Sequence, residues 1–120
     1  MYKILIVEDD LPMAQAIQKE MKMWGNEAEY VQDFQNVISA FTGYDPHLVL
    51  MDITMPNMDG LEALKAIRAK DSNANVVMCS AMGQEAMVVE AVQSGIKDFI
   101  VKPFKEDRLL KAVTSIVGNP

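Results

Sequence analysis

The sequence predicts an α/β fold in which a five-stranded parallel sheet has helices on both faces. Apolar runs of strand length alternate with segments of helical period five times along the chain, and the loops between them are short. Parallel strands need a crossover connection, and a helix after each strand supplies one. With 120 residues, half of them hydrophobic, the chain has enough apolar surface for one core, so we expect one domain.

The first strand is expected at Lys3–Val7, where an apolar run leads into acidic residues. Asp10 suits the N-cap of a helix whose apolar residues recur at helical spacing through Ala14–Trp24. Gly25 is expected to end that helix. The next strand, Glu27–Val31, is charged enough to lie at an edge of the sheet.

A second helix is expected after Asp33, which can cap it, with its inner face between Val37 and Phe41. Thr42–Pro46 then reads as a turn. The following run, Leu48–Asp52, is apolar until its last residue, which is typical of a strand buried on both faces.

The second half repeats the alternation of helix and strand. The expected elements are a helix after Gly60, a strand at Asn75–Ser80, a helix at Gly83–Ser94, a strand at Asp98–Val101 and a helix at Glu106–Val117. The apolar side of the fourth helix is predicted to be Met87, Val88, Ala91 and Val92.

Composition narrows the function classes. The net charge of −6 argues against direct nucleic-acid binding, which relies on clusters of Lys and Arg. No apolar run approaches the ~20 residues of a membrane span, and the N-terminus lacks a signal-peptide layout, so we expect a cytoplasmic protein without membrane contact. The single cysteine, Cys79, lies in an apolar run and is expected to be a buried, inert thiol.

Polar residues end four of the five predicted strands. They are Glu8, Asp9, Asp52, Ser80 and Lys102. In open α/β sheets, ligands bind at the carboxyl ends of the strands, so these side chains should share one site. Three carboxylates in a small space need a cation, and an all-oxygen ligand set suits Mg²⁺ or Mn²⁺. Such a site favours attack by the carboxylate of Asp52 on phosphorus, giving an acyl phosphate.

Each of these features also has a plainer interpretation. An acidic pair after a strand is most often a helix cap with a solvated charge, and an aspartate before a Met-Pro turn is most often a turn former. A Lys-Pro pair after a strand is usually a surface lysine. The coincidence of all three at strand ends favours a functional site over separate structural roles.

Over its whole length the chain resembles the receiver domain of bacterial response regulators. The motifs are Ile6-Val7-Glu8-Asp9-Asp10, Asp52-Ile53-Thr54-Met55-Pro56-Asn57-Met58-Asp59-Gly60, Ser80-Ala81 and Lys102-Pro103-Phe104. The resemblance implies one receiver domain at residues 1–120 with the doubly wound, flavodoxin-like or CheY-like (βα)5 architecture and the strand order 2-1-3-4-5.

The resemblance also implies a role for each site residue. Asp52 is implied as the phosphoacceptor. Asp9 and Asp52 are implied as direct Mg²⁺ ligands, with Glu8 acting through water and Thr54 through its backbone carbonyl. Lys102 is implied as the lysine that contacts the phosphoryl group, and its bond to Pro103 is expected to be cis.

The remaining implied roles concern switching and lifetime. Ser80 is implied as the hydroxyl that moves toward the phosphoryl group, and Phe99 as the aromatic residue that turns inward when Ser80 moves. Thr54 and Met82 flank the expected path of the attacking water, so they should tune the lifetime of the phosphorylated state.

The function implied is a phosphorylation switch in a two-component system. A sensor histidine kinase or a small phosphodonor would phosphorylate Asp52 with Mg²⁺ present, and the chain would catalyse the loss of its own phosphoryl group rather than turn over a substrate. The fourth helix, fifth strand and fifth helix, with Met87, Lys97 and Phe99, would form the output face for a target protein. A monomer is expected.

Three alternatives stay open at this point. Residues Asn75–Phe104 look like single-domain chemotaxis regulators of the CheY kind, whereas Met1–Leu50 look more like receivers of winged-helix transcription regulators. The chain is therefore a chemotaxis receiver, the receiver of a DNA-binding regulator, or an engineered mosaic (a chimera) joined near Asp52. A phosphohydrolase with an aspartyl intermediate is disfavoured, because such enzymes usually carry a second aspartate where this chain has Thr54.

Overall fold

The computed structural model describes residues 2–52, 60–81, 85–102 and 106–117. Strands and helices alternate through these residues, as the sequence predicts. The strands are β1 (Lys3–Val7), β2 (Glu27–Val31), β3 (Leu48–Asp52), β4 (Val76–Ala81) and β5 (Asp98–Lys102). The helices are α1 (Leu11–Met23), α2 (Phe34–Tyr44), α3 (Gly60–Lys70), α4 (Glu85–Gln93) and α5 (Glu106–Val117).

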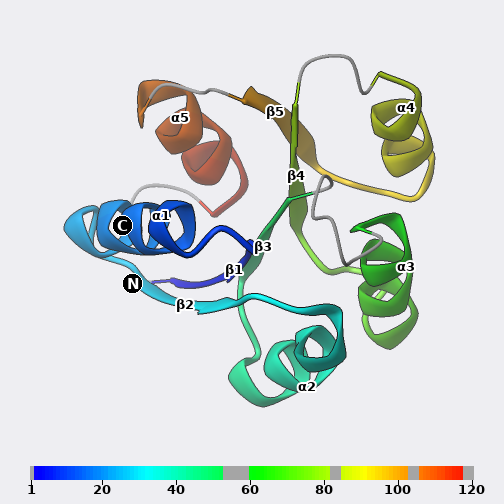
Figure 1. Ribbon diagram of the computed structural model, residues 1–120, viewed down its shortest axis with the longest axis horizontal. Helices are drawn as coiled ribbons and strands as arrows, with labels where there is room; N and C mark the ends of the chain where they lie inside the picture. Colours follow the sequence, from blue (N-terminus) through cyan, green and yellow to red (C-terminus); the bar gives the residue numbers. More distant parts are fainter. Residues whose placement is uncertain (1, 53–59, 82–84, 103–105, 118–120) are drawn as a thin grey trace.

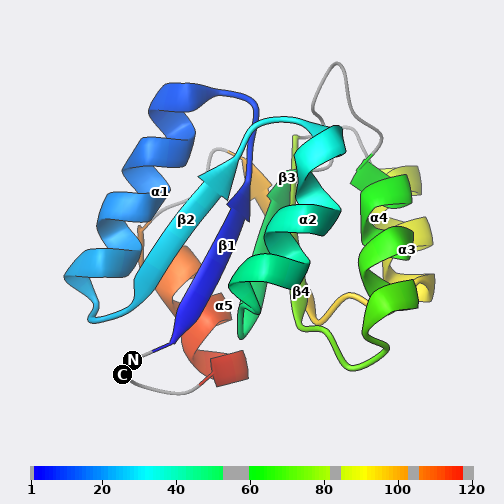
Figure 2. The ribbon, with the colours of Figure 1, turned by 90° about the horizontal axis from the view of Figure 1, so that it is seen from below.

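The five strands form one parallel sheet in the order β2-β1-β3-β4-β5, so the predicted fold class and strand order are confirmed. The arrowheads of neighbouring strands lie at the same edge of the sheet (Figure 2). The residues that follow β1 and end β3 and β5 therefore come together at that edge.

Two apolar layers flank the sheet. Leu5 and Val7 of β1 face α2 and α3, while Ile4 and Ile6 face α1 and α5. Helices α1 and α5 cover one face, and α2, α3 and α4 cover the other (Figure 1). Every residue of β3 is buried, which explains its continuous apolar run.

The edge position predicted for β2 is confirmed. Its register with β1 pairs Lys3 with Glu27 and Val7 with Val31. Glu27 and Glu29 are exposed while Ala28 between them is buried. Carboxylates on an edge strand discourage pairing with another sheet.

The predicted turn at Thr42–Pro46 is wrong in its first half, because α2 continues to Tyr44. A β-carbon at Gly43 would have no neighbour within 4 Å, so this glycine does not mark a close approach. Asp45, the residue that caps the end of α2, has a φ of 51°. Aspartate tolerates this left-handed conformation, and Pro46 cannot continue a helix.

The predicted inner face of the fourth helix is also partly wrong. Ala91 is buried, but Val92 is 53 % exposed and Val89 is 57 % exposed. Helix α4 packs on α3 and β4, and the side chains of Met87 and Val88 lie outside the described part of the chain. Adjacent positions on a helix point about 100° apart, so Val92 lies to one side of the face on which Ala91 is buried.

Across the described ranges, no helix combines the length and apolar character that a membrane crossing would require.

Candidate functional site

Strands β1, β3 and β5 bring the acidic residues and Lys102 to one edge of the sheet. Val7 of β1 pairs with Met51 of β3, so Glu8 follows beside Asp52. Asp52 is the last residue of β3 and pairs with Cys79 of β4. Lys102 is the last residue of β5, on the other side of β4. The parallel sheet thus assembles residues that are far apart in the sequence.

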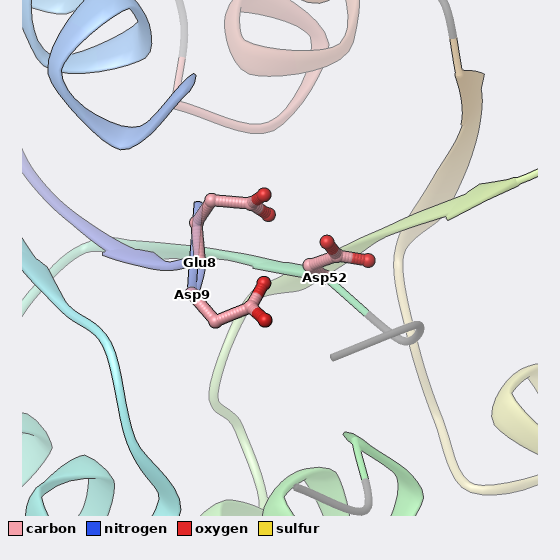
Figure 3. A group of neighbouring side chains, drawn as sticks. All are labelled: Glu8, Asp9 and Asp52. Atoms are coloured by element: carbon pink, nitrogen blue, oxygen red, sulfur yellow. The ribbon is translucent and has the colours of Figure 1, made fainter. Parts of the chain in front are cut away.

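The acidic side chains converge as predicted. Figure 3 shows the carboxylates of Glu8 and Asp9 turned toward Asp52. One carboxylate oxygen from each of the three residues lies within 4.8 Å of the others. Glu8 is 3 % exposed and Asp52 is 4 % exposed, while Asp9 is half-buried.

Lys102 supplies a positive charge to this cluster. Its Nζ donates to Asp52 Oδ2 at 2.7 Å and to Glu8 Oε1 and Oε2 at 3.2 and 3.1 Å. Burial alone lowers the pKa of Lys102, but hydrogen bonding to Asp52 and the charges of Asp52 and Glu8 outweigh it and raise the pKa. Lys102 is therefore held charged between two carboxylates.

One ammonium does not neutralise the cluster. Burial, followed by the hydrogen bond with Asp52 and its charge, raises the pKa of Glu8 from 4.5 to about 8. The charge and hydrogen bonds of Lys102 oppose this rise without cancelling it. Burial and the neighbouring carboxylate of Asp52 thus both favour the neutral form of Glu8.

The donor set fits a hard divalent cation. Its ligand atoms are carboxylate oxygens from Glu8, Asp9 and Asp52, and oxygen-only sites suit Mg²⁺ or Mn²⁺. Asp9 is the most exposed of the three and faces the same space as Asp52 (Figure 3). These residues would hold the cation that the sequence predicts.

The end of β2 supports the loop that carries Glu8 and Asp9. The backbone N–H of Glu8 donates to the carbonyl of Val31 at 3.1 Å. The side-chain amide of Gln32 donates to the carbonyl of Asp9, also at 3.1 Å. No local sequence pattern marks Gln32, because its contact with Asp9 depends on the position of β2 beside β1.

The geometry leaves several predicted site residues untested, and it tests others only in part. Thr54, Met82 and Pro103 lie outside the described residues. The backbone of Ser80 lies in β4 opposite Val101, but its side chain also lies outside the described part. Phe99 is in β5 and is 38 % exposed. The roles assigned to these residues stay predictions.

Cys79 matches its prediction. The residue is buried in the central part of the sheet, and burial raises the pKa of its thiol to about 12. A buried neutral thiol is a poor nucleophile, so Cys79 is a core residue rather than part of the chemistry.

Comparisons with known proteins agree with this geometry. The family described as "Response regulator receiver domain" matches residues 4–114. The chain is 51 % identical to the chemotaxis protein CheY of Listeria monocytogenes over 94 % of this chain and 96 % of that protein. It is 46 % identical to the chemotaxis protein CheY of Bacillus subtilis over 98 % of both chains.

A solved structure shows the same fold in a longer protein. NtrX from Brucella abortus matches 97 % of this chain with a TM-score of 0.91 and 30 % identity, and the chain spans 26 % of that protein. The two CheY matches run through Asp52 into both halves of the sequence. Both matches span the proposed join near Asp52, and the mosaic alternative stays a prediction, to be tested by searching with each half separately.

Proposed function

The chain belongs to the response regulator receiver domain family, and we propose that it is a phosphorylation switch whose phosphoacceptor is Asp52. The observation that carries the proposal is the buried carboxylate of Asp52 at the carboxyl end of β3, bonded to Lys102 and facing two further carboxylates. A structural ion pair would not need the two additional acids, which repel Asp52.

In the proposed reaction, a carboxylate oxygen of Asp52 forms a bond to phosphorus while the bond from phosphorus to the donor breaks. The donor is a sensor histidine kinase or a small phosphodonor. Lys102 already lies 2.7 Å from Asp52 Oδ2, so its ammonium is placed to offset negative charge on the transferred group. Ser80 would donate its hydroxyl to the same group.

A divalent cation, Mg²⁺ or Mn²⁺, would neutralise charge on the phosphoryl oxygens when bound. Asp9 and Asp52 would hold it directly, with Glu8 through water and Thr54 through its carbonyl. The ammonium of Lys102 would offset the negative charge of Glu8 beside the cation. The chain would also hydrolyse its own acyl phosphate, at a rate tuned by Thr54 and Met82, and would have no other turnover.

The output face is proposed to be α4, β5 and α5. Among the described side chains of α4 and β5, the exposed large apolar ones are Val89, Val92, Phe99 and Val101. Exposed apolar residues gathered on neighbouring elements suit a protein partner better than solvent. Phosphorylation would shift this face between two arrangements through Ser80 and Phe99, with Met87 and Lys97 at the contact.

A chemotaxis target, such as a flagellar motor component, is favoured over transcription. Both CheY relatives named above match this chain along almost their whole length and carry chemotaxis in their names. Asp98 is paired with Arg108 of the same chain at 3.3 Å, which supports a monomer rather than a dimer through this face. A cytoplasmic location is part of the same proposal.

The proposal is tested by incubating the protein with acetyl phosphate and Mg²⁺ and mapping any phosphate adduct by mass spectrometry. We expect one adduct, on Asp52, that disappears without Mg²⁺ and in Asp52→Asn. Asp107→Asn, which removes an exposed carboxylate of α5, is the matched control and should label as the wild type does. Full labelling of Asp52→Asn, or labelling of another residue, would contradict the assignment.

A further inference from the structure

Asp9 lies in a loop that needs support from outside. Strand β1 ends at Val7 and α1 begins at Leu11, so residues 8–10 belong to neither element. Asp10 occupies the N-cap position of α1, but its side chain makes no capping hydrogen bond. The direction of the carboxylate of Asp9 therefore depends on what holds its backbone.

The end of β2 provides two adjacent attachments for this loop. The first joins the Glu8 N–H to the Val31 carbonyl and continues the β1–β2 ladder. The second is the bond from Gln32 Nε2 to the Asp9 carbonyl at 3.1 Å. The second hydrogen bond comes from a side chain, so a substitution of Gln32 can remove it and leave the backbone bond of Glu8 in place.

We propose that Gln32 is a positioning residue for the acidic cluster, acting on cation affinity through the backbone of Asp9 without touching the cation. This inference rests on the cation site of the proposed function. Gln32 fixes the peptide carbonyl of Asp9 and thereby limits rotation of the backbone that aims its side chain at Asp52. Hydrogen-bond partners that hold a metal-binding residue in place, without touching the metal, commonly influence metal affinity.

The chain contains a matched control for this contact. Gln18 Nε2 donates to the carbonyl of Ala28 at 3.0 Å, joining α1 to β2. It is the same chemical interaction, a glutamine amide on a backbone carbonyl, but Ala28 lies within β2 rather than in the acidic loop. Gln32→Met and Gln18→Met each keep the length of the side chain and remove its donor.

The experiment is an amide NMR titration of each unphosphorylated protein with MgCl₂, together with urea unfolding. We expect Gln32→Met to raise the Mg²⁺ dissociation constant about 3- to 10-fold, and Gln18→Met to leave it unchanged. A readout of affinity separates positioning from support of the fold, since the bond of Gln18 is partly buried and that of Gln32 is exposed, so that loss of the Gln18 bond should lower stability at least as much.

Each outcome bears on the inference. Unchanged affinity in Gln32→Met, or equal weakening in Gln18→Met, would overturn it while leaving the cation site intact. Absence of Mg²⁺ binding by the wild type would overturn the cation site and this inference with it. If Gln32→Met does not fold, Gln32→Asn serves instead, because its amide is one methylene too short for the Asp9 carbonyl and should raise the dissociation constant in the same way.

Discussion

Lys102 has two opposing effects at the site. Its ammonium contacts Asp52 at 2.7 Å and Glu8 at 3.1 Å, and both carboxylates are almost fully buried. Without it, two buried acids would face each other with no counter-charge. A divalent cation attracted by the same carboxylates would, however, be repelled by the lysine. We therefore expect Lys102 to stabilise the acidic cluster and to weaken its affinity for a cation.

Replacing Lys102 by methionine should consequently tighten Mg²⁺ binding to the unphosphorylated protein. Removing one positive charge beside the ligands should lower the dissociation constant about 3- to 10-fold in low salt, as measured by titration calorimetry. Lys111→Met, an exposed change on α5, is the control for net charge and should have little effect. Weaker binding in Lys102→Met would mean that the lysine organises the ligands more than it repels the cation.

At the scale of the elements, two glycines in similar sequence positions near helix ends should respond oppositely to alanine. Gly95 has a φ of 97°, and a β-carbon there would lie 2.8 Å from Nη2 of Arg68. Gly43 lies inside α2 with open space around it. Gly95→Ala should lower the free energy of unfolding by about 1–2 kcal/mol, and Gly43→Ala should raise it by about 0.5–1 kcal/mol.

Urea unfolding of the two glycine variants measures both signs in one experiment. If Gly43→Ala lowered the free energy of unfolding, position 43 would require glycine even though its φ is helical and no atom lies close to it. A neutral Gly95→Ala would show that Arg68 moves aside and that the turn after α4 relaxes.

Arg108 of α5 adds polar contacts with β5 to the apolar packing between the two elements. Its guanidinium pairs with Asp98 at 3.3 Å and donates to the Phe99 carbonyl at 2.9 Å. Arg108→Ala should cost about 1 kcal/mol in unfolding free energy, since the groups are about one-third exposed and are screened by solvent. Lys65→Ala breaks the more exposed pair with Glu90 and should cost about 0.5 kcal/mol or less. Equal losses would mean that the bond to Phe99 adds nothing.

The helices and strands differ in how much of their structure could be predicted from the sequence. Strand β3 was predicted with the bounds that the structure shows, because burial on both faces leaves an unbroken apolar run. The end of α2 and the exposure of Val92 were missed, because they depend on which neighbours a helix packs against. The convergence of Glu8, Asp52 and Lys102 followed from their places at strand ends. The bond from Gln32 to Asp9 depends on lateral contact between two strands, which no local pattern contains.

For the molecule as a whole, we expect the acidic cluster to oppose stability, since three carboxylates face one ammonium. Burial first, and then the hydrogen bond with Asp52 and its charge, raise the pKa of Glu8, and Lys102 offsets only part of this rise. A functional site of this kind is expected to lower the stability of the unliganded fold. A substitution of Asp9 tests this effect, because its carboxylate belongs to the cluster while the ion pairs of Lys102 are with Glu8 and Asp52.

Asp9→Asn should therefore be more stable than the wild type by about 1 kcal/mol in Mg²⁺-free buffer, because it relieves repulsion among the buried carboxylates. With Mg²⁺ at about ten times its dissociation constant, the wild type should gain about 1.4 kcal/mol and the variant almost nothing, so the order should reverse. Urea unfolding with EDTA and with Mg²⁺ measures both. Asp10→Asn removes the same charge one residue outside the cluster, at an N-cap where asparagine serves equally well, and should keep the wild-type response to Mg²⁺. If Asp9→Asn gained as much from Mg²⁺ as the wild type, the cation would have to bind elsewhere on the molecule.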